Sequence, residues 1–113
     1  MDAAKLERLT NEVLRSLDWT SLRTRYRQTG DEWKARHRQF LFEPLDHRKV
    51  ENWREIAAIA ATLNSVPAIA DRMAELKRAG LTAALHSYEE SGFSALVLIV
   101  TFDETGQSAL EEG

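Results

Sequence analysis

The spacing of aliphatic residues near the start of the chain predicts an amphipathic helix over residues 3–17. Side chains three and four residues apart lie on one face of a helix. The apolar positions with this spacing are Leu6, Leu9, Val13 and Leu17. Charged side chains stand between them, so we expect one face of this helix to pack on the rest of the chain.

Residues 20–42 are compatible with two interpretations. Cations alternate with other residues on both sides of Gly30, and this two-residue period predicts a β-hairpin with strands 20–28 and 33–42. The alternative is two short helices broken at Gly30, because arginine, glutamine and lysine favour helices. The strict alternation and the apolar run at 40–42 favour the hairpin.

The next segment, residues 47–64, has the pattern of a strong helix. Asp46 is a good N-cap, and Leu45 and Val50 stand at the two positions of a hydrophobic staple. The predicted buried stripe of this helix is Trp53, Ile56, Ala57, Ala60 and Leu63.

A further helix is predicted over residues 68–79. Pro67 stands near its first position, where proline is favoured, and Gly80 follows its end, where glycine commonly terminates a helix. Its apolar face is Ile69, Met73 and Leu76.

The remaining apolar pattern predicts a second hairpin, with strands 81–88 and 93–102. The second strand is apolar on both faces, which is typical of a central strand or of one covered by a partner. Its two sets of apolar residues are Leu96, Leu98, Val100 and Phe102 on one face, and Val97 and Ile99 on the other.

These elements predict an α+β fold in the order α-ββ-αα-ββ. We expect a four-stranded antiparallel sheet with about three helices packed on one face. Residues 1–103 would form a single domain, and residues 104–113 a short polar C-terminal tail.

The totals of the chain narrow its class. With 113 residues, 43% hydrophobic and 29% charged, it matches an ordinary globular domain. Its lack of cysteine excludes disulfides and thiolate metal sites. The first residues are charged, and the longest apolar run, residues 95–100, is too short to span a bilayer. We therefore expect no signal peptide, no membrane partner and a cytoplasmic location.

The formal net charge of -3 is unevenly distributed. Residues 20–54 hold nine Lys and Arg against five Asp and Glu, whereas residues 55–113 hold three against nine. In the predicted first hairpin, Arg27 would lie opposite Lys34 and Arg25 opposite Arg36. Like charges opposite each other destabilise a sheet, so this surface would need an anionic counterpart.

The candidate binding residues follow from this charge map. His47, Arg48 and Lys49 fall in the first turn of a predicted helix, a place where phosphate or carboxylate binds. The full set is Arg23, Arg25, Arg27, Trp33, Lys34, Arg36, Arg38, His47, Arg48 and Lys49.

Catalytic and cofactor signatures are missing from the sequence. His37, His47 and His86 have no metal-ligand spacing, and no glycine-rich phosphate loop occurs. His86 and Ser87 are adjacent in a predicted strand and point to opposite faces, so they form no triad with Asp103. We predict no catalytic residues, no metal and no cofactor.

Two stretches, 56–67 and 100–106, are similar to a known enzyme family. IAAIAATLNSVP resembles the central helix of the pterin-4a-carbinolamine dehydratases, V-A-x-x-A-E-x-x-x-H-H-P, and VTFDETG resembles their T-H-D-x-x-G strand end. The resemblance implies an α-ββ-α-ββ-α order and a pterin-handling activity. The family's catalytic histidines correspond here to Ser65, Val66 and Phe102.

The leading prediction is a small non-catalytic protein-binding protein, a regulator, inhibitor or adaptor, that uses the basic aromatic-rich surface at 19–54. Its partner would be an acidic protein surface or a second copy of itself, and the apolar second strand predicts a homodimer. One alternative is a nucleic-acid-binding protein that uses the same surface, although a pI of 5.6 weighs against it. The other is a divergent pterin-dehydratase-like protein that lacks the family's histidines.

Overall fold

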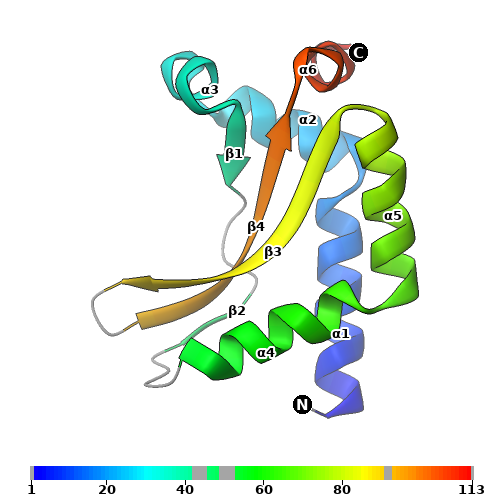
Figure 1. The fold of residues 1–113 in the computed structure, drawn as a ribbon, viewed down its shortest axis with the longest axis vertical. Coiled ribbons are helices and arrows are strands. Elements are labelled where there is room, and N and C mark those ends of the chain that lie inside the picture. The colour runs from blue at the N-terminus through cyan, green and yellow to red at the C-terminus, as the bar shows by residue number, and fades with distance from the viewer. Residues whose placement is uncertain (1, 42–45, 49–52, 91–92, 113) are drawn as a thin grey trace.

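A computed structural model describes residues 2–41, 46–48, 53–90 and 93–112. Three helices, two short strands and two further helices precede one long antiparallel strand pair, and a last helix follows it (Figure 1). The elements are α1 (Ala3–Ser16), α2 (Trp19–Gln28), α3 (Asp31–His37), β1 (Gln39–Leu41), β2 (Asp46–Arg48), α4 (Trp53–Asn64), α5 (Pro67–Arg78), β3 (Leu81–Glu90), β4 (Phe93–Phe102) and α6 (Glu104–Glu111).

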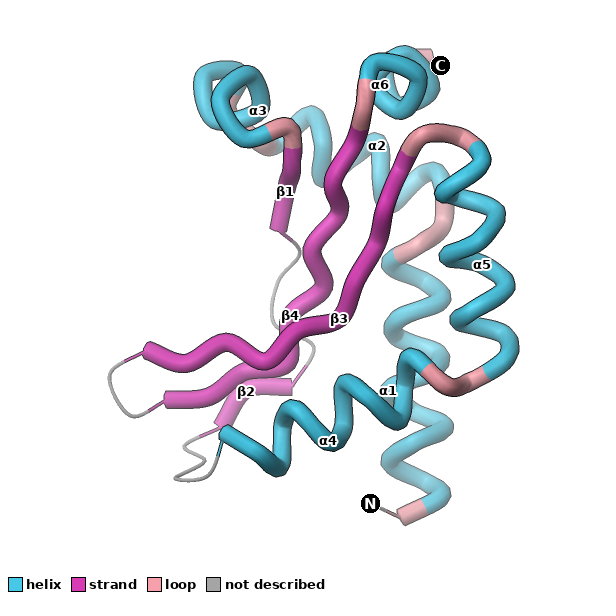
Figure 2. Tube along the Cα trace, in the orientation of Figure 1, coloured by secondary structure: helices cyan, strands magenta, loops and turns pink. Residues whose placement is uncertain are grey.

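The C-terminal hairpin predicted from the sequence is confirmed. β3 and β4 pair antiparallel over their ten residues each, from Leu81 opposite Phe102 to Glu90 opposite Phe93. Both strands bend midway, so the pair forms a curved ribbon (Figure 2). Alternate residues of β4, among them Leu96, Leu98 and Val100, are fully buried on its helix-covered face.

The predicted four-stranded sheet with about three helices is wrong. The extended sheet is the two-stranded ribbon, and the described residues form six helices. β1 and β2 add only three residues each to the free edge of β4, with Leu41 opposite Ile99 and Asp46 opposite Leu96. The two short strands do not form a hairpin with each other, because each one pairs with β4 instead.

The first predicted hairpin is replaced by α2 and α3, which is the alternative of two helices broken at Gly30. Trp19, Leu22 and Tyr26 are spaced by three and four residues, and Leu22 and Tyr26 are buried in the core. Asp18 caps α2 by accepting a hydrogen bond from the Thr20 N–H at 3.1 Å. Apolar spacing decides the conformation, because it determines which backbone buries these side chains.

The start of the next helix was also placed wrongly. α4 begins at Trp53, and Asp46 belongs to β2 instead of capping a helix. The free backbone groups along β4 offer residues 46–48 hydrogen bonds that outweigh local helix propensity. Trp53 therefore lies in the first turn, 48% exposed, whereas the predicted buried residues Ile56, Ala60 and Leu63 are in the core. The proposed staple at Leu45 and Val50 lies outside the described residues.

Helices α1 and α5 agree with the sequence. Leu9, Val13 and Leu17 are fully buried, and Pro67 occupies the first turn of α5. Gly80 has a φ of +90°, and its N–H donates to the Lys77 carbonyl at 3.0 Å, so it ends α5 in the conformation that favours glycine.

The expected polar tail is a helix. Asp103 caps α6 by accepting from the Gly106 N–H at 2.9 Å, and Leu110 is fully buried in the core. Gly106 lies so close to Gly80 that a Cβ there would collide with the Gly80 carbonyl. One local feature, the Asp103 cap, and two tertiary contacts, the burial of Leu110 and the close approach of Gly106 to Gly80, therefore hold α6 on the end of the ribbon.

The helices form two groups around the ribbon. α1, α4 and α5 lie along one side of it, while α2, α3 and α6 gather where β4 ends (Figure 1). On the other face of β4, Ala95 and Val97 are 1% and 3% exposed within the single chain. Ile99, the other residue predicted on this face, is half-buried, and the homodimer stays a prediction. Among the described residues, none of the helices has the length and apolarity needed to cross a membrane.

Candidate functional site

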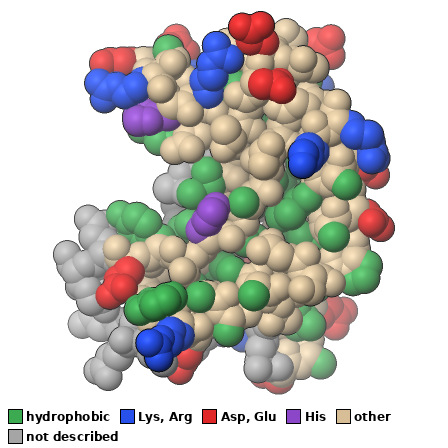
Figure 3. Space-filling model, viewed as in Figure 1, with side chains coloured by type: hydrophobic (Ala, Val, Ile, Leu, Met, Phe, Trp, Pro, Cys, Tyr) green, Lys and Arg blue, Asp and Glu red, His purple; other side chains and the backbone are tan. Residues whose placement is uncertain are grey.

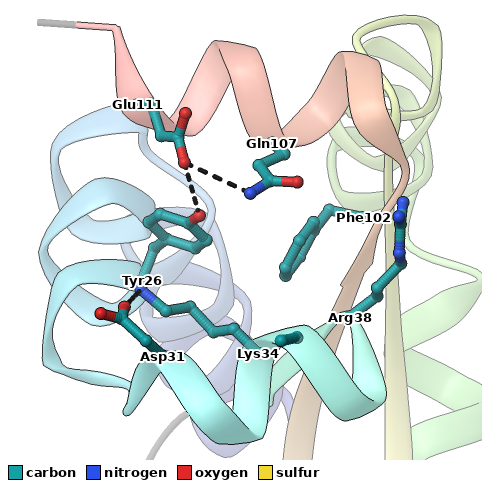
Figure 4. A pocket seen from close by; sticks show the side chains of 8 residues that line it. Tyr26, Asp31, Lys34, Arg38, Phe102, Gln107 and Glu111 are labelled. Carbon is teal, nitrogen blue, oxygen red and sulfur yellow. Dashed lines mark hydrogen bonds and ion pairs between the residues drawn. The ribbon is translucent and has the colours of Figure 1, made fainter.

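A pocket of about 530 Å³ lies between α3 and α6 (Figure 4). Its floor is formed by Tyr26 of α2 and Phe102 of β4, whose rings meet edge to face at 5.5 Å. The walls are mostly polar and come from segments far apart in the sequence: Asp31, Lys34, Ala35 and Arg38 on one side, and Gln107 and Glu111 on the other.

Glu111 organises one end of the pocket. The Tyr26 hydroxyl donates to Glu111 Oε1 at 3.1 Å, and Gln107 Nε2 donates to the same oxygen at 3.3 Å. The pKa of Tyr26 is raised mainly by burial of the phenol and also by its hydrogen bond to the Glu111 carboxylate. Both donors are neutral at physiological pH, so they leave the charge of Glu111 uncompensated.

Lys34 and Asp31 form an ion pair within α3, on one wall of the pocket. Lys34 Nζ lies 3.0 Å from Asp31 Oδ1 and 4.0 Å from the centroid of the Tyr26 ring. The lysine side chain is only 11% exposed, because the tyrosine ring and the helix cover it. An ammonium placed in this way stiffens the pocket wall and has little charge left for a ligand.

Arg38 differs from the other cations of the segment. It is the one non-glycine residue with a positive φ, +50°, among the described residues, and it ends α3 in the left-handed conformation. Its side chain is exposed and lines the pocket beside Phe102 (Figure 4), with no ion pair or side-chain hydrogen bond to any described residue. A guanidinium of this kind is available to a carboxylate or phosphate.

The predicted cationic sheet face does not form. Arg23 donates from Nε and Nη2 to the Ala109 carbonyl at 3.4 Å, and its guanidinium lies 5.2 Å from the centroid of Trp19. It thus stabilises the C-terminal turn of α6, where cations are favoured. Arg25 is half-buried and Arg27 exposed on α2, and both take part in further contacts.

Trp33, Arg36 and His37 lie on α3 away from the pocket lining. Trp33 is 38% exposed, and its ring lies tilted against the His37 ring with centroids 4.8 Å apart. Basic and acidic side chains lie close together over α3 and α6 in Figure 3. The cations of residues 23–38 are therefore spread around two helices. They do not form the single cationic sheet face that would have required an anionic partner.

The helix start on which the predicted anion site depended is wrong. His47 and Arg48 lie in β2, opposite Ala95 and Ser94 in register, so they do not belong to a first helical turn. Lys49 lies outside the described residues.

Six pocket residues were absent from the sequence-based set: Tyr26, Asp31, Ala35, Phe102, Gln107 and Glu111. The Asp103 cap signal followed by Leu110 at helical spacing was the available hint that residues 104–111 form a helix. Their meeting with α2 is a tertiary contact across 85 residues, and no local pattern encodes it.

A second, smaller cavity of about 310 Å³ lies where the end of α5 meets β3 and β4. Its one carboxylate, Asp103, is already engaged as the cap of α6. Within the described residues, no group of three or more His, Asp or Glu is placed to hold a metal ion. His86 is exposed on β3 and Ser87 is half-buried next to it, as expected for neighbours on opposite strand faces.

Comparison with known proteins adds no relative. No family model, no curated protein and no solved structure matches this chain. The resemblance to the pterin-4a-carbinolamine dehydratases therefore has no support from a family model, and the pocket geometry carries the functional argument alone.

Proposed function

We propose that this protein is a non-catalytic binding protein that holds an acidic side chain of a partner protein in the pocket between α3 and α6. The observation that carries the proposal is Arg38, an unpaired guanidinium in a pocket wall. Its backbone conformation favours glycine, and an L-residue there costs about 1 kcal/mol. An arginine at such a position is well explained by a role in binding.

A protein partner fits this pocket better than a small molecule. Sites for small ligands are mostly apolar and bury most of the ligand surface, whereas this one is walled largely by charged and amide side chains. The neighbouring face of α3 exposes Trp33 and Arg36, residue types that are enriched at the centres of protein interfaces. The cytoplasmic location predicted from the sequence belongs to the same proposal.

The test is a nuclear magnetic resonance titration of the ¹⁵N-labelled protein. The probe is a heptapeptide with blocked ends that carries one glutamate among glycines and serines, and its counterpart carries glutamine. We expect the glutamate peptide to shift the Arg38 Nε–H and Gln107 side-chain amide signals, and the glutamine peptide to leave them in place.

Two variants locate the effect. Arg38→Gln is expected to abolish the response, while Arg36→Gln, outside the pocket lining of the same helix, is expected to preserve it. The proposal is contradicted if Arg38→Gln responds like the native protein, or if millimolar peptide produces no shift in the pocket. Salt-sensitive binding of oligothymidylate through Arg25, Arg27 and Arg36 would assign the cations to nucleic acid instead.

A further inference from the structure

The charges in the pocket are not all available to a ligand. Lys34 Nζ already pairs with Asp31 Oδ1 at 3.0 Å, although the Asp31 side chain is fully exposed. Glu111 accepts only neutral donors, the Tyr26 hydroxyl and the Gln107 amide. Arg38 pairs with none of the described residues. One positive and one negative charge therefore remain without an opposite partner.

These two charges stand at opposite ends of the same pocket. In Figure 4, Arg38 lies beside Phe102 at the end of α3, and Glu111 lies beyond Tyr26 near the end of α6. They form no ion pair with each other, and both side chains are exposed. The pocket is therefore dipolar, with aromatic rings as its floor.

From this arrangement we infer that the pocket selects a partner segment that carries one acidic and one basic side chain. The acidic group pairs with Arg38, and the basic group pairs with Glu111. This inference rests on the proposed function and narrows its ligand, because a purely acidic segment would place a negative charge near Glu111. Like charges at an interface disfavour the wrong partner, so Glu111 provides selectivity.

The positions of Tyr26 and Gln107 support this role for Glu111. Their hydrogen bonds, at 3.1 and 3.3 Å, restrain Oε1 of the carboxylate before a ligand arrives. A fixed carboxylate loses less side-chain entropy on binding than a free one. The partner's cation would meet a carboxylate already held against the pocket wall.

The experiment uses blocked heptapeptides that carry one glutamate and one lysine, with one to four intervening residues. Two neutral analogues of each are used, with glutamine for the glutamate or methionine for the lysine. Dissociation constants are measured by nuclear magnetic resonance for the native protein, Arg38→Gln and Glu111→Gln. Glu111→Gln keeps an acceptor for Tyr26, and unchanged Tyr26 and Phe102 ring signals verify that the pocket is intact.

We expect removal of the peptide lysine to weaken binding to the native protein by about two- to five-fold, the range of exposed ion pairs. The same removal should have no effect on Glu111→Gln. Removal of the peptide glutamate should likewise matter to the native protein and have no effect on Arg38→Gln. Such paired losses are the coupling that a double-mutant cycle measures.

The other outcomes are distinguishable. If glutamate peptides bind through Arg38 but the lysine adds nothing at any spacing, the dipolar inference is overturned and the proposed function stands. If no peptide binds in the pocket, both are overturned. Equal binding of a free glutamyl-lysine dipeptide would identify a small-molecule site and contradict both.

Discussion

The two groups of helices around the ribbon are stabilised by different interactions. The aliphatic group, α1, α4 and α5, lies along one side of the ribbon, and the polar group, α2, α3 and α6, gathers where β4 ends (Figure 1). Where α4 and α5 pack on β3 and β4, the contacts are between fully buried aliphatic residues such as Leu63, Leu76 and Leu98. Where α2, α3 and α6 meet, α3 buries no residue completely and α6 buries only Gly106 and Leu110. α2 adds Leu22 and Tyr26 to the core, and the remaining contacts among these three helices are hydrogen bonds, an ion pair and ring contacts.

This difference assigns stability and binding to separate parts of the molecule. Apolar burial contributes most of the free energy of folding, so the packing of the aliphatic group on the ribbon determines whether the chain folds. The polar group can hold charges without an ion-pair partner, such as Arg38 and Glu111, without weakening the aliphatic core. Functional sites commonly lie on such less stable elements.

The largest expected effect is a difference in the free energy of unfolding between variants in the two groups. Leu98→Ala should lower the free energy of unfolding by about 3 kcal/mol, because Leu98 is fully buried in the core. Trp33→Ala, on half-exposed α3, should lower it by about 0.5 kcal/mol. Urea unfolding followed by circular dichroism measures both. Similar losses of unfolding free energy for the two variants would remove the distinction between the aliphatic and polar groups.

A second variant tests how α6 is held. Gly106→Ala should destabilise the protein by about 2 kcal/mol, since the added methyl group would collide with Gly80. Helix propensity alone predicts a gain of about 1 kcal/mol, so the sign is informative. Ser108→Ala, exposed on the same helix, is the matched control and should be tolerated. A stabilised Gly106→Ala protein would mean that α6 does not approach Gly80.

Two exposed threonines sharpen the contrast between helix and strand. Thr24→Ala in α2 should stabilise the protein by about 0.5 kcal/mol through helix propensity. Thr82→Ala in β3 should destabilise it by about 0.5 kcal/mol, because Thr82 stands opposite Thr101 on a strand. Thermal unfolding of both variants gives the signs. Destabilisation by Thr24→Ala would favour a strand at residues 20–28.

The smallest effect concerns Tyr26 and alkaline pH. Its pKa is raised above 10.0 by burial and by the hydrogen bond to Glu111. The folded state therefore favours the protonated phenol. This contribution to stability is present below pH 10.0 and declines as the pH rises through the pKa of the folded state. Tyr26→Phe should show a shallower alkaline loss of stability, and an unchanged loss would exclude Tyr26 as its source.

Sequence patterns predicted the ribbon and its aliphatic group much better than the polar group. α1, α5 and the β3–β4 pair follow from the spacing of leucine, valine and isoleucine, because burial of these side chains dominates the choice of backbone. At residues 23–38 the alternation involves cations, whose long side chains can reach solvent or polar partners from a helix or a strand, so their spacing specifies neither conformation. Trp19, Leu22 and Tyr26 carried the helical period there.

The pocket was less predictable than the fold. Lys34 and Arg38 were among the candidate residues, but their reason for being there, a shared cationic sheet face, does not hold. Tyr26 and Glu111 meet across 85 residues of sequence, and that contact depends on α6 folding back over α2. A single sequence contains no local signal for such a meeting.

The most direct test of the account replaces Arg38 and Arg36 by glycine and measures unfolding and peptide binding on the same samples. Arg38→Gly should stabilise the protein by about 1 kcal/mol, because its φ of +50° favours glycine, and should abolish binding of the glutamate–lysine peptide. Arg36→Gly, inside α3, should destabilise by about 1 kcal/mol and retain binding. A destabilised Arg38→Gly protein, or one that binds the peptide as the native protein does, would contradict the claim that Arg38 occupies this position for recognition.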